Sequence, residues 1–186
     1  MGTYAARVRT KKDLLPGEWA VLALLCERPA HGYAIASAMA PDGDVGEIWS
    51  LSQQHTYRTL STLQALGHLE VSAVTPGAGA PRRTELTATP EAKRMVSRWL
   101  RTPERHIRDL RPGLLLKLHL LRRRGRSPLP LLEAQRNLLA RTLAELAASD
   151  VEDQPTALLN RWRRTMAAAA LTFVEQTIAD AAPTGT

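Results

Sequence analysis

The stretch Leu51–Gly67 reads LSQQHTYRTLSTLQALG and carries apolar or semi-apolar residues in steps of three. They are Tyr57, Leu60, Leu63 and Leu66. This spacing predicts a helix of about three to four turns with one buried stripe. Ser52 stands where an N-cap is expected, and Gly67 follows the last apolar residue as a C-terminal stop.

The opposite face of this helix is polar but almost uncharged. It carries Gln53, Gln54, His55, Arg58, Ser61 and Thr62. Amide, guanidinium and hydroxyl groups read base edges in the major groove of DNA, whereas a face that serves only solubility normally holds Glu and Lys. The pattern favours a recognition helix, and an ordinary solvated face remains the alternative.

Composition predicts a helical protein with a polyanionic partner. Of the 186 residues, 44% are hydrophobic and only 4% aromatic, with many Leu and Ala, which fits one or two helix-rich domains. The net charge is +7 and the pI about 10.3. Residues 1–100 hold 11 Lys and Arg against 9 Asp and Glu, a net of +2, so attraction to nucleic acid must come from local clustering.

The sequence favours a cytoplasmic location for the protein. Cys26 is the only cysteine and lies in an apolar run, which favours a reduced core residue over a disulfide or a metal ligand. No apolar run approaches the ~18 residues that a membrane span needs. The first twelve residues, MGTYAARVRTKK, lack an apolar signal core, and we expect no membrane association.

Two helices are expected before the recognition helix, at Pro16–Glu27 and at about Gly32–Ala40. Tight connections join the three, which is a helix-turn-helix layout. After Gly67 the pattern changes to alternation, which predicts strands over residues 68–74 and 82–87 around a Gly-rich loop at 75–81.

This hairpin is expected to form a wing behind the third helix. Arg82, Arg83 and Thr84 stand at its tip or returning edge, where arginines suit phosphates or the minor groove. A nucleotide-binding loop is the weaker alternative, because the loop lacks the third glycine of the dinucleotide fingerprint and the Gly-Lys-Ser/Thr of the P-loop, and it leads into a strand.

After the hairpin, the sequence predicts a helix, a linker and a second helical domain. Thr89-Pro90-Glu91 begins a helix that runs to about Leu100, and the charged residues 101–112, with two prolines, are expected to be a linker. We therefore expect a basic arm at 1–14, a winged helix-turn-helix domain at 15–100 and a helical dimerisation domain at 113–182. The fold class is mostly α with a small β-hairpin wing.

The dimerisation domain is predicted from Leu-rich helices whose apolar faces need a cover. The segment 114–121 is helical if Lys117 and His119 lie at its margin. The arginine-rich cluster at 122–126 either binds phosphates or only places positive charge at the C-terminus of a helix, and both alternatives stay open. The residues expected at the dimer interface are Leu132, Leu139, Leu146, Leu159, Trp162, Met166 and Phe173.

Several N-terminal motifs together resemble the PadR family of transcriptional regulators. They are Leu22–Leu25, Pro29–Tyr33, Trp49–Ser52, Tyr57–Leu69, Gly79–Thr84 and Leu86–Ala92, in the family's order and spacing over about residues 15–100. The resemblance implies a winged-helix homodimer, usually a repressor, that in many members responds to small aromatic or cationic compounds. The C-terminal pattern resembles the dimerisation domain of the family's virulence-activator branch.

The chain departs from the family pattern at its third helix. Gln53 and Gln54 stand where the family often has Pro-Gly, and Arg58 stands where it often has Pro. Ser61 and Thr62 replace a usual basic pair, so their phosphate contacts should be weaker and the operator sequence cannot be transferred. The resemblance places Tyr57 at the DNA backbone, with a core position as the alternative.

These observations predict a homodimeric regulator, most simply a repressor, on a near-palindromic operator in double-stranded DNA. The alternative is a winged-helix adaptor that binds only protein. A candidate pocket for a small aromatic effector would use the four tryptophans, whose alternative role is packing; they are Trp19, Trp49, Trp99 and Trp162. The scattered histidines and the lack of a nucleophile motif predict no enzyme, no cofactor and no metal site.

Overall fold

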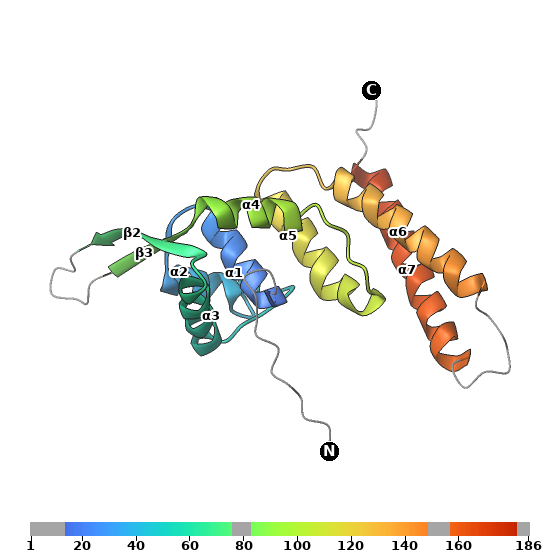
Figure 1. Cartoon of the computed structure of the whole chain (residues 1–186), viewed down its shortest axis with the longest axis horizontal. Helices are drawn as coiled ribbons and strands as arrows, with labels where there is room; N and C mark the ends of the chain where they lie inside the picture. Colours follow the sequence, from blue (N-terminus) through green and yellow to red (C-terminus); the bar gives the residue numbers. More distant parts are fainter. Residues whose placement is uncertain (1–13, 76–82, 149–156, 182–186) are drawn as a thin grey trace, which may run out of the picture. The chain divides into compact units, whose positions relative to one another are not determined.

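The computed structural model describes residues 14–75, 83–148 and 157–181, and most of them are helical (Figure 1). The chain divides into two compact units, residues 1–96 and 97–186. The predicted fold class, mostly α with a β-hairpin wing, is confirmed. The expected linker at 101–112 lies inside the second unit and includes short helical turns, and the predicted domain boundaries stay predictions.

The first unit is a winged helix. Its helices are α1 (Pro16–Glu27), α2 (Gly32–Met39) and α3 (Gln53–Ala65). Its antiparallel sheet has the order β1-β3-β2, from β1 (Ala30–His31), β2 (Leu69–Thr75) and β3 (Arg83–Ala88). Figure 1 shows β2 and β3 extending as a hairpin away from the three helices. The predicted helices and the wing strands are confirmed to within about a residue or two at each end.

Helix α1 is the centre of this unit. Every residue from Ala20 to Leu25 is buried and apolar, so this part of the helix is covered on all sides. Helices α2 and α3 and strand β3 contact it. Its first turn is closed by Glu18, whose carboxylate accepts a hydrogen bond from the Leu15 N–H at 2.8 Å. The other elements of the unit are therefore arranged around α1.

Strand β1 was not predicted. It consists of two residues, Ala30 opposite Leu86 and His31 opposite Glu85 of β3. Two residues are too short to show alternation, and this strand exists only because β3 offers its free edge to the chain between α1 and α2.

Helix α4 (Pro90–Trp99) contains the boundary between the two units, after Val96. Thr89 is its N-cap, as predicted: the Thr89 hydroxyl accepts a hydrogen bond from the Ala92 N–H at 3.3 Å. The N–H of Thr89 donates to the His68 carbonyl at 2.9 Å, which fixes where the helix leaves the sheet.

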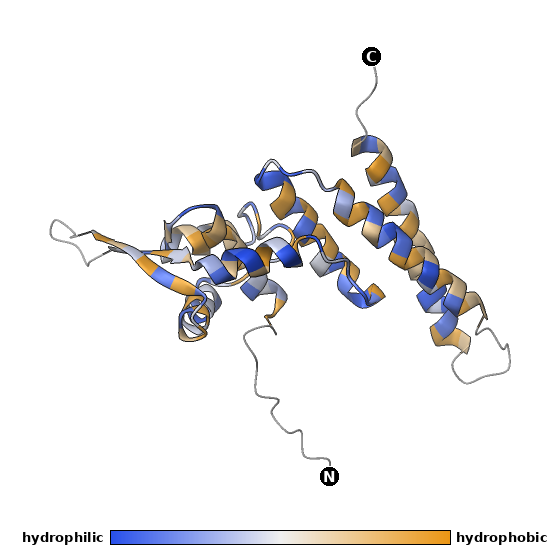
Figure 2. Ribbon diagram, turned by 45° about the horizontal axis from the view of Figure 1, so that its top comes forward, coloured by the Kyte–Doolittle hydropathy of each residue, from blue (hydrophilic) through white to orange (hydrophobic). Residues whose placement is uncertain are grey.

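In its described residues, after the end of α4, the second unit contains a 3-10 turn, η1 (Ile107–Asp109), a π-helical turn, η2 (Leu110–Leu114), and three α-helices. The helices are α5 (Leu115–Arg123), α6 (Leu129–Ala148) and α7 (Ala157–Ala181). Helices α6 and α7 pack side by side (Figure 1), and apolar and polar bands alternate along both (Figure 2). Neither these nor any other helix in the described residues is long and apolar enough to span a membrane.

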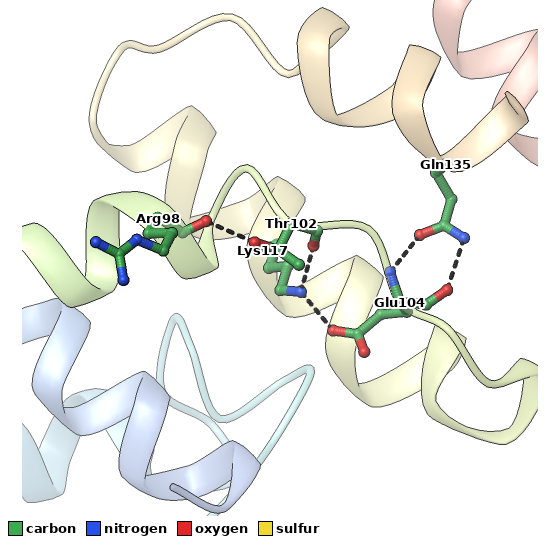
Figure 3. Close-up of polar contacts among 5 residues, drawn as sticks. All are labelled: Arg98, Thr102, Glu104, Lys117 and Gln135. Carbon is green, nitrogen blue, oxygen red and sulfur yellow. Dashed lines mark hydrogen bonds and ion pairs between the residues drawn. The ribbon is translucent and has the colours of Figure 1, made fainter. Parts of the chain in front are cut away.

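The prediction that Lys117 lies at the margin of its helix was wrong. Lys117 is only 2% exposed, and its ammonium lies 2.6 Å from a carboxylate oxygen of Glu104 (Figure 3). It also donates to the Thr102 carbonyl at 2.7 Å and lies 5.1 Å from the centre of the Trp99 ring. These partners supply the compensation that a buried charge requires. We call these four residues together with Gln135 the Lys117 network.

Gln135 completes the Lys117 network from α6. Its side-chain amide accepts the Glu104 N–H at 2.7 Å and donates to the Glu104 carbonyl at 3.0 Å. Gln135 is fully buried, so both bonds form away from water, where an unpaired amide would be costly. Glu104 is thus tied by its side chain to α5 and by its backbone to α6.

Removing the Glu104 carboxylate should destabilise the second unit in a pH-dependent way. Burial lowers the pKa of the Lys117 amine, and Glu104 opposes that shift. Glu104→Ala leaves the ammonium buried without its partner, and we expect a loss of about 2–4 kcal/mol in the free energy of unfolding at pH 7. Denaturant unfolding followed by circular dichroism would measure the loss.

The pH dependence has a definite sign. In Glu104→Ala the folded-state pKa of Lys117 falls further below its ordinary value of 10.5, so the unfolded chain binds more protons in that window and stability rises with pH there. The deficit should therefore shrink as pH rises toward 10.5. Glu133→Ala, which removes an exposed carboxylate from α6, is the control. An equal and pH-independent loss in both variants would contradict the assignment.

Candidate nucleic-acid interface

Helix α3 has one buried and one exposed side. Thr56, Leu60 and Leu63 are buried, and α1 and α2 contact the helix. The predicted stripe is confirmed for Leu60 and Leu63, Leu66 is only partly buried, and the prediction was wrong for Tyr57, which is 44% exposed. Tyr57 lies about 100° around the helix from Thr56, at the edge of the buried side, so part of its side chain is exposed.

The N-terminus of α3 is fixed by Ser52, as predicted. The Ser52 hydroxyl accepts the His55 N–H at 3.3 Å, and it lies 2.8 Å from Nδ1 of the His55 ring. This second contact orients an exposed imidazole and leaves Nε2 as the ring nitrogen available to another molecule. The C-terminus ends at Gly67, whose φ of 72° is in the region that favours glycine.

The outward side of α3 forms a shallow hollow on the surface. Its lining residues are Gln53, Gln54, Tyr57, Arg58, Ser61 and Thr62. These are all the predicted recognition residues of the helix except His55, which is exposed beside them. The helix contains no Asp or Glu, so the surface offers amide, hydroxyl and guanidinium groups without a repelling carboxylate.

Tyr57 packs against the start of α2. A Cβ atom on Gly32 would lie 2.7 Å from Cε1 of Tyr57 and 3.3 Å from Cδ1 of Leu60. Gly32 therefore provides space, and the Tyr57 ring occupies it while part of the side chain stays exposed. Neither alternative for Tyr57 describes this position fully, because the ring is both packed and accessible.

The wing is described only in part. Arg82 lies outside the described residues, and Arg83 begins β3 opposite Thr75. Thr84 is exposed, and its carbonyl lies 3.2 Å from Nδ1 of His31, while Nε2 of His31 lies 3.4 Å from a Glu85 carboxylate oxygen. Sequence reasoning missed this role of His31. In the described part of the chain no three His, Cys, Asp or Glu side chains are grouped as metal ligands.

The four tryptophans are divided between the units. Trp19 and Trp49 are partly buried in the first unit. In the second unit the Trp99 ring contacts Lys117, whereas Trp162 is 60% exposed and lines a different groove. A pocket built by all four stays a prediction, and Trp162 is the one that the structure places beside a sizeable hollow.

The residues expected at a dimer interface differ in exposure. Leu132 and Leu139 are buried within this chain and contribute to the core of the second unit. Leu146 and Met166 are partly buried. Leu159, Trp162 and Phe173 on α7 are 45%, 60% and 42% exposed, so they are the residues of the predicted set that a second copy could contact directly.

Comparisons with known proteins give distant structural similarity only. No family model and no curated protein matches the chain. Bacillus subtilis PadR in complex with operator DNA is 19% identical, with a TM-score of 0.44, over 88% of this chain and 98% of that one. The same protein with p-coumaric acid is 18% identical, with a TM-score of 0.42, over 90% and 99%. Streptococcus mutans UA159 smu.1604c is 16% identical, with a TM-score of 0.43, over 89% and 99%. These values are too low to assign a family or a function.

Filling the space beside Gly32 should displace Tyr57. Gly32→Ala forces the ring and the neighbouring Leu60 side chain to shift, and overpacking of this kind costs about 1–3 kcal/mol of stability. The double variant Gly32→Ala/Tyr57→Ala should recover most of the loss, because the clashing ring is gone. Thermal unfolding of both variants against Tyr57→Ala alone checks this, and failure to recover would contradict the contact.

Proposed function

We propose that this chain is a DNA-binding transcription regulator that inserts the outward side of α3 into the major groove. The observation that carries the proposal is the acid-free, hydrogen-bonding surface of α3, held outward by burial of Leu60 and Leu63 within a winged helix. The PadR-like motifs of residues 15–100 support the same function. We further propose a homodimeric repressor on a near-palindromic operator.

Some residues of α3 would contact base edges and others the phosphate backbone of the DNA. Gln53 and Gln54 at the N-terminus suit bidentate contacts to adenine, and Arg58 one turn later suits guanine. The His55 ring, oriented by Ser52, offers one further contact. The hydroxyls of Tyr57, Ser61 and Thr62 would reach phosphates, as would Arg82, Arg83 and Thr84 on the wing.

A twofold dimer would place two copies of α3 about 34–36 Å apart, on successive turns of the major groove. Exposed Leu159 and Phe173 on α7 support a contact with a second copy. A small aromatic effector that releases the repressor from DNA completes the proposal.

Arg58 provides the sharpest test of recognition. Arg58→Ala should weaken binding to the preferred DNA by about 1–3 kcal/mol and relax the preference at one base pair. Fluorescence anisotropy with the DNA that flanks its own coding region, at two salt concentrations, would measure this. Gln64→Ala is the matched control, because Gln64 is exposed on α3 but does not line the hollow. Equal affinities of the two variants would rule out α3 as the reading helix.

The wing should act on all sequences alike. Arg82→Ala removes a proposed phosphate contact, so affinity should fall by a similar factor for every DNA and the salt dependence should flatten by about one counterion. Competition with unrelated duplex DNA across a salt series measures both effects. An unchanged salt slope would mean that the wing does not contact the backbone.

A protein-binding adaptor is the second candidate. The net charge of +2 over residues 1–100 favours it, because a nucleic-acid module usually has a stronger positive field. Absence of any DNA binding by the wild-type protein at low salt would support the adaptor over the regulator.

A further inference from the structure

A small cavity in the second unit lies where the ends of three helices meet. The end of α4, the end of α5 and the start of α6 form its wall, and every residue that lines it belongs to the second unit. Its volume is about 140 Å³. That is well above the ~15 Å³ that one water needs and well below the usual size of drug-sized ligand sites. The cavity is therefore suited to a small polyatomic ion.

The polar part of this cavity is cationic. Arg101, Arg124 and Arg126 line it together with two serines, and none of its described lining residues is acidic. Among the described residues, the side chains of Arg101 and Arg126 form no ion pair. Three guanidinium groups around one cavity repel one another, and an anion between them would turn that repulsion into charge-assisted hydrogen bonds.

The apolar part of the wall consists of three buried leucines, Leu100, Leu121 and Leu131. Apolar walls exclude water and lower the local dielectric constant, so a hydrogen bond between ions is stronger there than on an open surface. This property distinguishes the cavity from a basic surface that is merely solvated.

Two of the arginines start from fixed backbone positions. Helix α5 ends in a turn in which the Arg126 N–H donates to the Leu121 carbonyl at 3.0 Å. Arg101 directly precedes Thr102, whose carbonyl accepts a hydrogen bond from the Lys117 ammonium at 2.7 Å. Groups that are positioned before a ligand arrives lose less entropy when it binds.

The start of α6 adds a weaker attraction for an anion. The Ser127 hydroxyl, which lines the cavity, accepts a hydrogen bond from the Leu129 N–H at 3.3 Å. Its own hydrogen can therefore be donated to another acceptor. The partial positive charge at a helix N-terminus also favours anions, although the arginines are the main source of attraction.

The cavity divides the arginine cluster of residues 122–126 into two groups. Arg122 and Arg123 lie exposed in the last turn of α5, where positive charge complements the helix C-terminus. Arg124 and Arg126 line the cavity instead, and Arg101 joins them from the segment after α4. Complementing the end of α5 therefore does not account for the arginines at the cavity.

From this arrangement we propose that the cavity binds a phosphate dianion, either free inorganic phosphate or the phosphate group of a small phosphorylated compound. Arg101 and Arg126 donate to the phosphate oxygens, Arg124 supplies a third positive charge and Ser127 a hydroxyl donor. The rival ligand is a phosphate of the DNA backbone. A backbone phosphate carries one negative charge and two bulky substituents, so it suits a small cavity with three arginines less well.

The test is calorimetric titration of the full chain with inorganic phosphate, with chloride holding the ionic strength constant. One phosphate should bind per chain. Arg126→Met removes the charge and keeps an apolar stem, so it should weaken binding about tenfold, as should Arg101→Met. Arg122→Met is the matched control, because it removes the same charge from the same cluster at an exposed position outside the cavity, and it should leave the affinity unchanged.

Two further ligands identify the source of the phosphate. Binding of glycerol 3-phosphate at similar affinity would show that the cavity admits phosphorylated compounds, and binding of inorganic phosphate alone would restrict it to the free ion. Dimethyl phosphate, a diester with one charge like the phosphates of DNA, should bind at least about tenfold more weakly than inorganic phosphate, because it lacks one charge.

Three outcomes would overturn the proposal. The wild-type chain fails to bind inorganic phosphate, or Arg122→Met weakens binding as much as Arg126→Met, which would indicate only diffuse positive charge. Alternatively, dimethyl phosphate binds as tightly as inorganic phosphate, which would assign the arginines to the DNA backbone. No DNA is present in these titrations, so their failure would not count against the reading role of α3, which the Arg58→Ala measurement tests separately.

Discussion

Burial of Leu60 and Leu63 on the side of α3 that packs against α1 and α2 fixes which side of the helix faces solvent. The two leucines remove apolar area worth about 1.5–3 kcal/mol each, so rotation of α3 about its axis would cost more than any single polar contact returns. The amides of Gln53 and Gln54 then face outward because the opposite side of the helix is buried. The candidate interface is thus a consequence of packing on the opposite side of the same helix.

In the second unit a charge takes the organising role that apolar packing has in the first. Moving the Lys117 ammonium out of water is unfavourable, and Glu104, the Thr102 carbonyl and the Trp99 ring together offset that cost. An apolar residue would fill the same space without the free-energy cost of removing a charge from water. A lysine, however, can hold one carboxylate in one place, and Gln135 binds the backbone of the residue that bears it. The network contributes less to net stability than to fixing the course of the chain after α4.

Most of the fold could be predicted because it is local. The period of three in α3, the caps at Ser52 and Thr89 and the change to alternation after Gly67 each depend on residues within a few positions of one another. The outward face of α3 followed from the same periodicity. Its orientation could therefore be predicted from sequence, although its role in binding DNA remains a proposal.

The features that sequence reasoning missed depend on distant partners. Strand β1 exists through pairing with residues more than fifty positions away, and Lys117 is buried because Glu104 reaches it from an irregular segment. Leu132 and Leu139 show a seven-residue repeat that fits a dimer seam and an internal core equally well, and only the packing of α6 separates the two. A Leu repeat indicates that a face is covered but does not identify what covers it.

The distribution of charge on α3 bears on the homodimer that we propose. Helix α3 carries one fixed charge, Arg58, so most of its proposed base contacts would come from neutral groups, and counterion release would come chiefly from Arg82 and Arg83 of the wing. Hydrogen bonds of that kind discriminate between sequences but give modest affinity in water. Two copies on adjacent half-sites bind with a high effective concentration for the second contact, which raises affinity without new charges. In the proposed regulator, the exposed apolar residues of α7 offer a surface on which two copies could pair.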